Sequence, residues 1–347
     1  MLIYWMMFWM PLLGAISPRP MVSSQSRTMF VLVCAIFAVL IGLRDEVGGD
    51  WVNYLPMFEN ISTWDFAWAA ESKDVGYVLL NWLVAQVGGG IYAVNLVCAS
   101  IMMIGTFHFC RNLPNPWLAL LVAVPYMLIV VGMGYTRQAV ALGCAMFGLV
   151  SLNKGRTLSF VACMVFGATF HSSGVLLIPI AGFASSRQRI WRGIWIVAAF
   201  VIAYVLLLQS ETDVLWASYI TSNQMHSYGA VERVLMNVVA TIPLFLFGKR
   251  LVENPQTRRL WMVIAALALV CLPFVFVAST AVDRLALYLL PLQLFVFSHL
   301  PNLTRNATAR TGIVAGIVAY YAAVQFVWLN YAVERHGWVP YHFMSFE

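Results

Sequence analysis

Ten stretches of the chain are almost wholly apolar, and short polar segments separate them. They are residues 2–16, 28–43, 91–109, 116–133, 137–152, 190–209, 233–248, 259–279, 283–300 and 311–330. About 20 apolar residues suffice to cross a bilayer as a helix. Two further stretches, 75–88 and 157–183, are too short or too interrupted for one plain span and are typical of re-entrant or short paired helices. The pattern predicts an all-α polytopic membrane protein with about 10–12 transmembrane helices plus such short helices.

Composition supports this fold class. Of the 347 residues, 62% are hydrophobic and only 10% are charged, which is too little polar material to coat a soluble globule. We therefore expect one membrane domain over 1–347, with outer segments at 44–75, 210–232 and 331–347. The six cysteines lie in or beside apolar runs without paired or zinc-type spacing, so neither a disulfide framework nor a metal site is expected.

The charged residues divide unequally between the two sides. Ten crossings place both termini on one side, and alternate loops then collect fourteen of the twenty Lys and Arg residues but one acid, Glu253, on the opposite side. Because cytoplasmic loops are enriched in Lys and Arg, that opposite side is predicted to be cytoplasmic and both termini external. The net charge of +6 thus reflects topology and does not indicate a nucleic-acid partner.

Four outer arginines stand at the edges of apolar runs: Arg44, Arg137, Arg233 and Arg284. A charge at the membrane edge costs free energy unless something pairs with it. One explanation pairs these arginines with acids adjacent in sequence, such as Asp45, Glu232 and Asp283. For the four together we favour convergence on an anionic ligand, because the guanidinium fork binds phosphate oxygens bidentately and stays charged when partly desolvated.

Two outer residues could take a proton. Asp50 follows a Gly48–Gly49 turn near Arg44, and its carboxylate could accept a proton from a sugar hydroxyl or orient it. His171 lies among small hydroxyl residues inside an apolar stretch, and imidazole can act as a base near neutral pH. The alternatives are a solvated turn that caps a helix for Asp50, and a hydrogen-bonded packing residue for His171.

Several short motifs follow one another along the chain. Arg44, Gly48, Asp50 and Tyr54 form an R-x-x-x-G-x-D-x-x-x-Y pattern, which Gly76 and Tyr77 follow. The later motifs are Arg137–Gln138 at the start of an apolar run, Phe170–His171–Ser172 with Pro179, Arg284 with Tyr288, and Trp338, Pro340 and Tyr341 near the end. In order and spacing, over nearly the whole chain, this set resembles the EpsG-like, Wzy-type polysaccharide polymerases.

The resemblance implies a multi-pass enzyme of the bacterial inner membrane. Such an enzyme joins oligosaccharide repeat units carried on undecaprenyl pyrophosphate at the periplasmic face, as a metal-independent glycosyltransferase without a cofactor. Its partners would be a lipid-linked donor, a lipid-linked acceptor, membrane lipids and a chain-length regulator. Both termini would be periplasmic.

The resemblance and the outer charges together give a set of expected roles. Arg137, Arg233 and Arg284 are expected to bind the pyrophosphate, with Arg44 either joining them or holding Asp50. His171 and Asp50 are alternative bases, and His171 is preferred if its segment rises to the outer face. Further residues are expected to bind substrate, namely Tyr54, Tyr77, Gln138, Tyr228, Tyr288 and Tyr341.

Other activities remain open at this point. A lipid-glycan flippase would need a polar path with polar groups at both faces, whereas the unusual charges lie on one face and no inverted repeat stands out. An O-antigen ligase uses the same donor with a lipid A core acceptor, so the mechanism alone does not separate it from a polymerase. A membrane acyltransferase would need a cytoplasmic route for its acyl donor, which the sequence does not show.

Overall fold

The computed structural model describes residues 1–17, 24–184 and 229–344, together with residues 194, 197 and 201. The first half of this part contains α1 (Leu2–Ile16), α2 (Ser24–Gly42), β1 (Arg44–Asp45), α3 (Trp51–Ser62), α4 (Phe66–Glu71), α5 (Val75–Gln86), α6 (Ile91–Cys110), α7 (Pro116–Ala123), the π-helix η1 (Val124–Val131), α8 (Gly132–Gly134), α9 (Thr136–Asn153), α10 (Thr157–Phe170), the 3-10 helix η2 (Ser172–Leu177) and α11 (Ile180–Ala184). The second half contains α14 (Ala230–Leu251), α15 (Pro255–Phe274), α16 (Ser279–Tyr288), α17 (Pro291–His299), the 3-10 helices η4 (Leu300–Leu303) and η5 (Val333–Gly337), α18 (Ala307–Tyr331) and β2 (His342–Phe343).

Six helical segments of this part are long and apolar enough to cross a membrane: Gln25–Gly42, Ile91–Cys110, Pro116–Gly134, Ala230–Leu251, Pro255–Phe274 and Ala307–Tyr331. The pair Ser279–Tyr288 and Pro291–Leu303, bent by 46°, would be a seventh. The all-α polytopic fold class is confirmed.

The number of long spans among the described residues falls below the ten to twelve expected for the whole chain. One of the ten runs, 2–16, forms a helix of only 15 residues, α1, and the first helix of the stretch 157–183, α10, has 14 residues. The run at 137–152 forms α9, whose first turn is polar because it contains Thr136, Arg137 and Gln138. The predicted span at 190–209 lies outside the described residues. The stretch 157–183 forms short helices, as expected, with a break at His171 between α10 and η2.

The segment α7–η1–α8 is the centre of the bundle. It is buried along its entire length, because α1, α6, α17 and α18 pack around it. It begins with Pro116 at the first helical position, where the missing N–H of proline costs nothing. It ends at Gly134. Tyr135 follows, and from Thr136 the helix α9 runs back through the bundle. The central helix therefore delivers Arg137 to one end of the molecule.

The α6–α9 contact fixes the direction of α9. A side-chain carbon at Gly105 would lie 2.1 Å from the backbone oxygen of Gly143, so the two backbones approach too closely for any larger residue. Small residues at such crossings are how helices pack tightly in membranes. α9 in turn packs against α10, which places the break at His171 beside the same end of the bundle.

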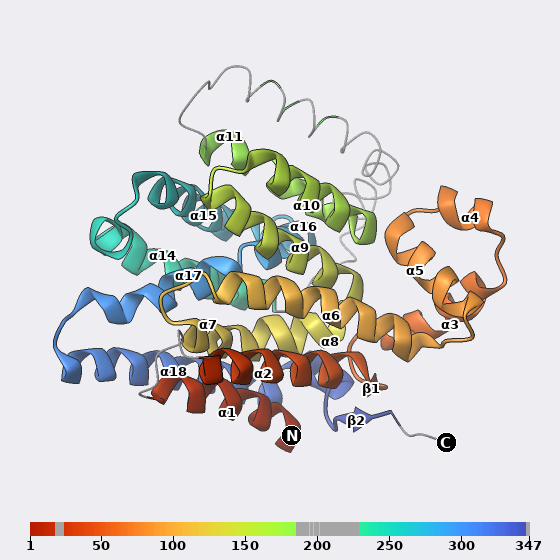
Figure 1. Ribbon diagram of the computed structural model, residues 1–347, viewed down its shortest axis with the longest axis horizontal. Helices are drawn as coiled ribbons and strands as arrows, with labels where there is room; N and C mark the ends of the chain where they lie inside the picture. The colour runs from red at the N-terminus through yellow and green to blue at the C-terminus, as the bar shows by residue number, and fades with distance from the viewer. Residues whose placement is uncertain (18–23, 185–193, 195–196, 198–200, 202–228, 345–347) are drawn as a thin grey trace.

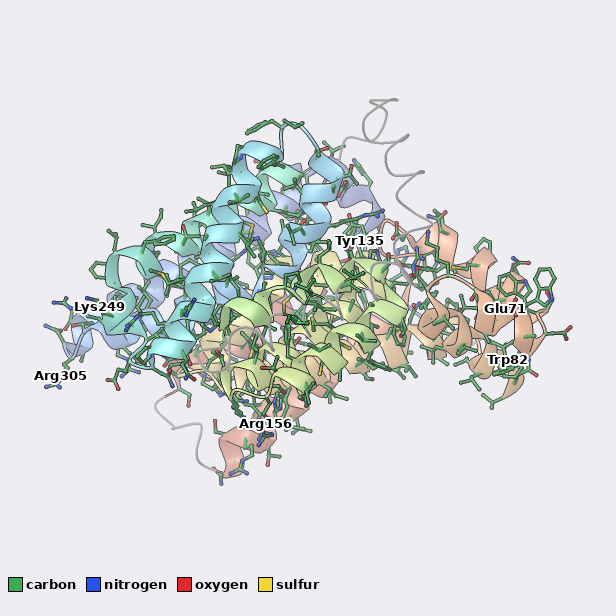
Figure 2. The ribbon with its side chains drawn as sticks, turned by 90° about the horizontal axis from the view of Figure 1, so that it is seen from above. Glu71, Trp82, Tyr135, Arg156, Lys249 and Arg305 are labelled. Atoms are coloured by element: carbon green, nitrogen blue, oxygen red, sulfur yellow. The ribbon has the colours of Figure 1, made fainter. Side chains whose placement is uncertain are left out.

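The two ends of the bundle differ in charge and structure. The helices α3, α4 and α5 project from one end, which we call the α3–α5 end, and β1 and β2 lie at that end too (Figure 1). In Figure 2, Glu71 and Trp82 mark this end, whereas Lys249 and Arg305 lie at the opposite one. The first residues of α1 also reach the α3–α5 end, since the hydroxyl of Tyr4 donates to the carbonyl of Trp338.

The C-terminal segment closes onto the loop after α2. β1 and β2 pair antiparallel, with Arg44 opposite Phe343, and the Gly48 N–H donates to the Gly337 carbonyl at 2.6 Å. Gly48 has φ +112°, and a side-chain carbon there would lie 2.1 Å from the Met133 oxygen. Only glycine fits this position. The loop that leads into Asp50 is thus held against the end of the central helix.

Candidate functional site

Five separate parts of the fold bring polar side chains together at the α3–α5 end. We call this group the outer cluster; its members are Asp50, Tyr54, Asp74, Tyr77, Arg137, His171, Ser173, Arg284 and Tyr288. Asp50 and Asp74 precede the first turns of α3 and α5, Arg137 lies in the first turn of α9, His171 lies between α10 and η2, and Arg284 lies on α16. The structure therefore assembles a site from residues up to 238 positions apart in sequence, from Asp50 to Tyr288.

Arg137 is the cation best connected within this cluster. Its Nη1 lies 2.7 Å from Asp74 Oδ2, and its guanidinium stacks over the rings of Tyr54 and Tyr77, with Cζ 6.0 and 5.9 Å from the ring centroids. Its side chain keeps 33% exposure, and its Nε is buried without a hydrogen-bond partner in the described part of the chain. Arg137 is thus held in place by Asp74 and the two tyrosine rings, while a third of its side chain stays open to a ligand.

Asp50 lies half-buried between positive charges. The Tyr54 hydroxyl donates to Asp50 Oδ2 at 3.5 Å. Burial raises the pKa of Asp50, and the nearby guanidinium groups of Arg137 and Arg284 act in the opposite direction. A carboxylate with a raised pKa takes up a proton more readily than an ordinary aspartate. Asp50 can therefore act as a base here.

His171 caps the 3-10 helix η2 and lies outside the candidate spans. Its Nδ1 accepts a hydrogen bond from the Ser173 N–H at 3.4 Å and lies 2.6 Å from Ser173 Oγ, which donates to the Tyr288 hydroxyl at 3.1 Å. Burial lowers the pKa of His171, and the charges of Arg284 and Arg137 lower it further. The imidazole is therefore neutral, with one ring nitrogen that donates a hydrogen bond and one that accepts.

Arg284 completes the cluster from α16. Its charge acts on both Asp50 and His171. Among the described residues, no carboxylate lies within ion-pair distance of its guanidinium, because the adjacent Asp283 pairs with Arg233 instead. Neighbours at i and i+1 on a helix face different directions, which explains why adjacency in sequence does not produce a pair here. Arg284 is only partly buried and can meet a ligand.

Arg233 forms a second polar group next to the outer cluster. Its Nη2 donates to Asp283 Oδ2 at 2.7 Å, its Nε contacts Asp283 Oδ1, and its Nη1 donates to the Tyr126 hydroxyl. This bidentate pair ties the start of α14 to α16 and to the central helix. It explains how a cation that is 2% exposed is tolerated at the membrane edge.

Arg44 differs from the other three arginines because it is buried in a cage of oxygen atoms. It is 1% exposed, and its three nitrogens donate to the Val47 and Ile41 carbonyls and to Thr136 Oγ1, at 2.9, 2.6 and 2.8 Å. It does not pair with Asp45, which accepts from the Tyr92 hydroxyl at 2.7 Å. Arg44 thus holds the loop after α2 against the start of α9, and at 1% exposure it is shielded from a ligand.

The residues expected to bind substrate are distributed unevenly. Tyr54, Tyr77 and Tyr288 belong to the outer cluster, and Gln138 is buried beside Arg137 with its Nε2 unpartnered among the described residues. Tyr341 lies elsewhere, since its hydroxyl donates to the Leu40 carbonyl and its ring packs edge-on against Tyr4. Tyr228 and most of the predicted outer segment 210–232 lie outside the described residues.

The sequence reasoning missed Tyr126, Thr136 and Glu334. Thr136 and Tyr126 satisfy the donors of Arg44 and Arg233, and Glu334 faces the charges of Arg233, Asp283 and Asp50. Tyr126 carried a usable signal, because a hydroxyl in the middle of an apolar run must find a partner. Glu334 carried none, since a carboxylate in a terminal segment is ordinarily solvated.

A comparison with protein families covers the residues of this site. The EpsG family model matches residues 27–343, which include every member of the outer cluster. No curated protein and no solved structure matches the chain. Because the match spans nearly the whole chain and its fold is an all-α membrane bundle, the protein belongs to the EpsG family of Wzy-like polysaccharide polymerases.

Proposed function

We propose that this chain polymerises undecaprenyl-pyrophosphate-linked oligosaccharide repeat units, transferring the glycan of one lipid-linked molecule to the acceptor sugar of another. The observation that supports the proposal is the outer cluster, in which the positive charges of Arg137 and Arg284 act on both Asp50 and His171. A glycosyl transfer from a lipid pyrophosphate needs a base for the incoming hydroxyl and positive charge for the leaving group. Both are present at one end of the bundle.

The reaction follows from these groups. The oxygen of the acceptor hydroxyl bonds to the anomeric carbon of the donor, and the bond from that carbon to the pyrophosphate breaks. The pyrophosphate leaves with the bonding electrons, and the hydroxyl proton passes to the base. Arg137 and Arg284 stabilise the charge that develops on the leaving oxygens, since guanidinium groups bind phosphate oxygens without needing a metal ion.

We assign the base role to Asp50. Its raised pKa suits it to accept the proton, whereas the lowered pKa of His171 makes the imidazole a poor acceptor. His171 instead forms a hydrogen bond, as a neutral imidazole, with the sugar or the phosphate. Among the tyrosines, Tyr54 orients Asp50, and Tyr77 with Tyr54 fixes the plane of the Arg137 guanidinium.

The roles of the four arginines differ in this proposal. Arg137 and Arg284 bind the pyrophosphate. Arg233 acts through Asp283, because the pair fixes the α16 turn on which Arg284 stands. Arg44 positions the loop before Asp50 and the start of α9.

We place the reaction at the periplasmic face of the bacterial inner membrane, with both termini on that side. The supporting observation is the distribution of charge. The end opposite the outer cluster carries exposed basic residues, including Lys249, Arg250 and Arg305, and basic loops favour the cytoplasmic side.

The test is a polymerisation assay with purified protein in lipid nanodiscs and lipid-linked repeat units. Arg284→Ala should lower the initial rate at least about 100-fold, the size of loss typical when a transition-state donor is removed. Arg250→Ala, an exposed arginine at the opposite end of α14, is the matched control and should retain the wild-type rate. EDTA should leave the rate unchanged.

The products distinguish the alternatives. Longer glycans on the lipid indicate polymerisation, movement of the lipid-linked glycan without a new bond indicates transport, and transfer to a lipid A core alone indicates ligation. Wild-type chain lengths from both Arg284→Ala and Arg137→Ala would show that these two arginines do not bind the pyrophosphate as proposed.

A further inference from the structure

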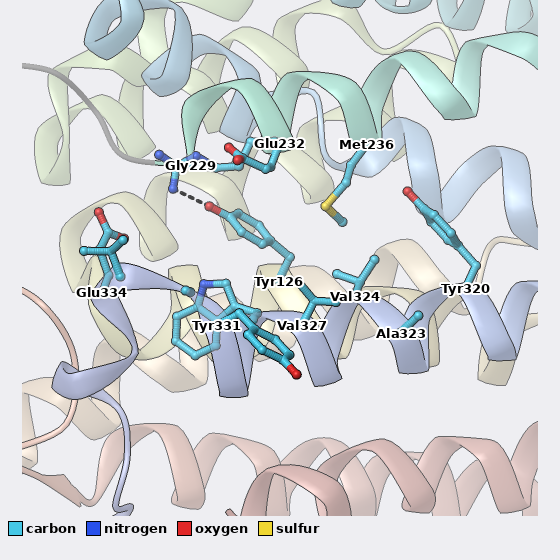
Figure 3. Close-up of a pocket in the computed structure, with 14 residues that line it drawn as sticks. Tyr126, Gly229, Glu232, Met236, Tyr320, Ala323, Val324, Val327, Tyr331 and Glu334 are labelled. Atoms are coloured by element: carbon cyan, nitrogen blue, oxygen red, sulfur yellow. Dashed lines mark hydrogen bonds between the residues drawn. The ribbon is translucent and has the colours of Figure 1, made fainter.

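A groove of about 540 Å³ runs between α14 and α18, next to the outer cluster but separate from it. Met236 lines its α14 wall, and Ala323, Val324, Val327 and Trp328 line its α18 wall. Figure 3 shows Met236, Ala323, Val324 and Val327 facing the space between the two helices, with Tyr126 of the central helix between them. The groove is therefore walled mainly by apolar side chains of two candidate membrane spans.

The two walls belong to different parts of the bundle. α14 packs against α15, α16 and α17, whereas α18 packs against α7 and η1. The space between them is consequently not filled by a direct contact of one helix with the other. Several side chains along its α18 side are more than half exposed, among them Val327 and Tyr331.

The groove has one charged end and one apolar end. Glu232 and Arg233 at the start of α14 and Glu334 just after α18 lie at the charged end, and Tyr320 lies toward the other (Figure 3). From Tyr320 to Tyr331 the helix rises about 16 Å at 1.5 Å per residue. The length and the apolar walls match an elongated apolar chain that enters the groove from its charged end.

The charged end continues into the outer cluster. Tyr135 lies near both, because the charges of Glu334 and Arg233 at the groove and of Asp50 in the cluster all act on it. Asp283, which pairs with Arg233, directly precedes Arg284 on α16. A molecule whose head is bound by Arg284 could therefore extend its tail past Arg233 into the groove.

We infer that this groove binds the polyprenyl chain of the lipid-linked donor, an inference that rests on the proposed function. The apolar walls offer few partners to a glycan or to a peptide backbone, both of which need hydrogen bonds. The donor is preferred to the acceptor because its pyrophosphate is bonded to the reacting carbon and so enters the outer cluster. In the acceptor, the lipid lies a repeat unit away from the reacting hydroxyl.

The test uses the full-length protein in nanodiscs of phosphatidylethanolamine and phosphatidylglycerol, with a polyprenyl pyrophosphate that carries a diazirine in its chain. After irradiation, mass spectrometry should find the label on peptides of α14 and α18 that contain Met236 and Ala323. Unlabelled undecaprenyl pyrophosphate should reduce the labelling at least fivefold, and added phosphatidylglycerol should not.

Two groove variants and one control sharpen this test. Ala323→Trp fills the groove, and Val324→Phe narrows it with a smaller change; both should lower labelling at least fivefold. Ala309→Trp places the same bulk at the exposed start of α18, away from the groove, and should label like the wild type. Wild-type labelling in both well-folded groove variants, label elsewhere on the bundle, or equal competition by phosphatidylglycerol would overturn the inference.

The result also separates this inference from the proposed function. Labelled groove peptides in a protein that never lengthens a glycan would support the groove as the lipid site and refute the polymerase function. Normal chain growth by Ala323→Trp would refute the groove as the lipid site and leave the polymerase function standing.

Discussion

At the scale of single residues, the four membrane-edge arginines are not equivalent. Their sequence contexts look alike, since each stands at the border of an apolar run. The structure separates them by their partners: backbone and hydroxyl oxygens for Arg44, Asp283 and Tyr126 for Arg233, Asp74 for Arg137, and no carboxylate within the described residues for Arg284. Partner identity depends on residues distant in sequence, which no local pattern encodes.

The pH profile of polymerisation should report Asp50. Because burial raises the pKa of Asp50, the carboxylate becomes protonated at a higher pH than an ordinary aspartate, whose pKa is about 3.9. Activity should therefore fall as the pH drops through that raised value and recover above it. His171→Asn keeps an acceptor for the Ser173 N–H and should retain this acidic limb at a lower maximal rate. A limb that disappears in His171→Asn would assign the base to His171.

Arg44→Ala should destabilise the protein more than it affects chemistry. The substitution removes three hydrogen bonds from a buried cation and leaves two backbone carbonyls without a partner. The expected loss is on the order of 3 kcal/mol. A lower melting temperature in detergent would show it, whereas Arg284→Ala should melt like the wild type. An Arg44→Ala protein of normal stability and no activity would place Arg44 in the chemistry instead.

At the scale of elements, the short motifs mark places where the chain changes direction. Gly48 lets the loop after α2 pass against the Met133 carbonyl, and the His171 motif breaks the helix between α10 and η2. The sequence predicted the break, because polar and small residues interrupt an apolar run. It could not predict that β2 would pair with β1, since two-residue strands have no periodicity.

The terminal segment should be needed to hold the loop that carries Asp50. Trp338 donates from Nε1 to the Ile129 carbonyl at 3.0 Å and packs against Gly49 and Gly134. Trp338→Ala should therefore increase hydrogen exchange of amides 44–50 and lower activity, while the exposed Trp68→Ala should do neither. Unchanged exchange in Trp338→Ala would show that the loop is held by other contacts.

At the scale of the whole molecule, the fold class and the expected orientation were predicted from the apolar runs, the composition and the distribution of charge. The apolar runs gave the fold class and the positions of nearly every described long helix, because burial in a bilayer constrains every residue of a span. For the outer cluster, the sequence predicted which residue types would be present and that they would lie on the same side of the membrane. Which side chains meet was not predictable, because it depends on helix packing between distant segments, such as Gly105 against Gly143.

The orientation in the membrane can be tested by cysteine labelling. Glu71→Cys lies on the α3–α5 insertion and should react with an impermeant maleimide in intact spheroplasts. Lys249→Cys lies at the opposite end and should react only after permeabilisation. The wild-type protein is the background control, since five of its six cysteines are buried. The reverse pattern would invert the topology and place the outer cluster in the cytoplasm.

The most direct measurement is a cryo-electron microscopy structure of the protein with bound undecaprenyl pyrophosphate. The phosphate oxygens should lie within hydrogen-bond distance of Arg137 and Arg284, with Asp50 and His171 facing the position of the anomeric carbon. Phosphates bound at the basic end near Lys249, or at the lipid-facing surface away from Arg137 and Arg284, would contradict the account.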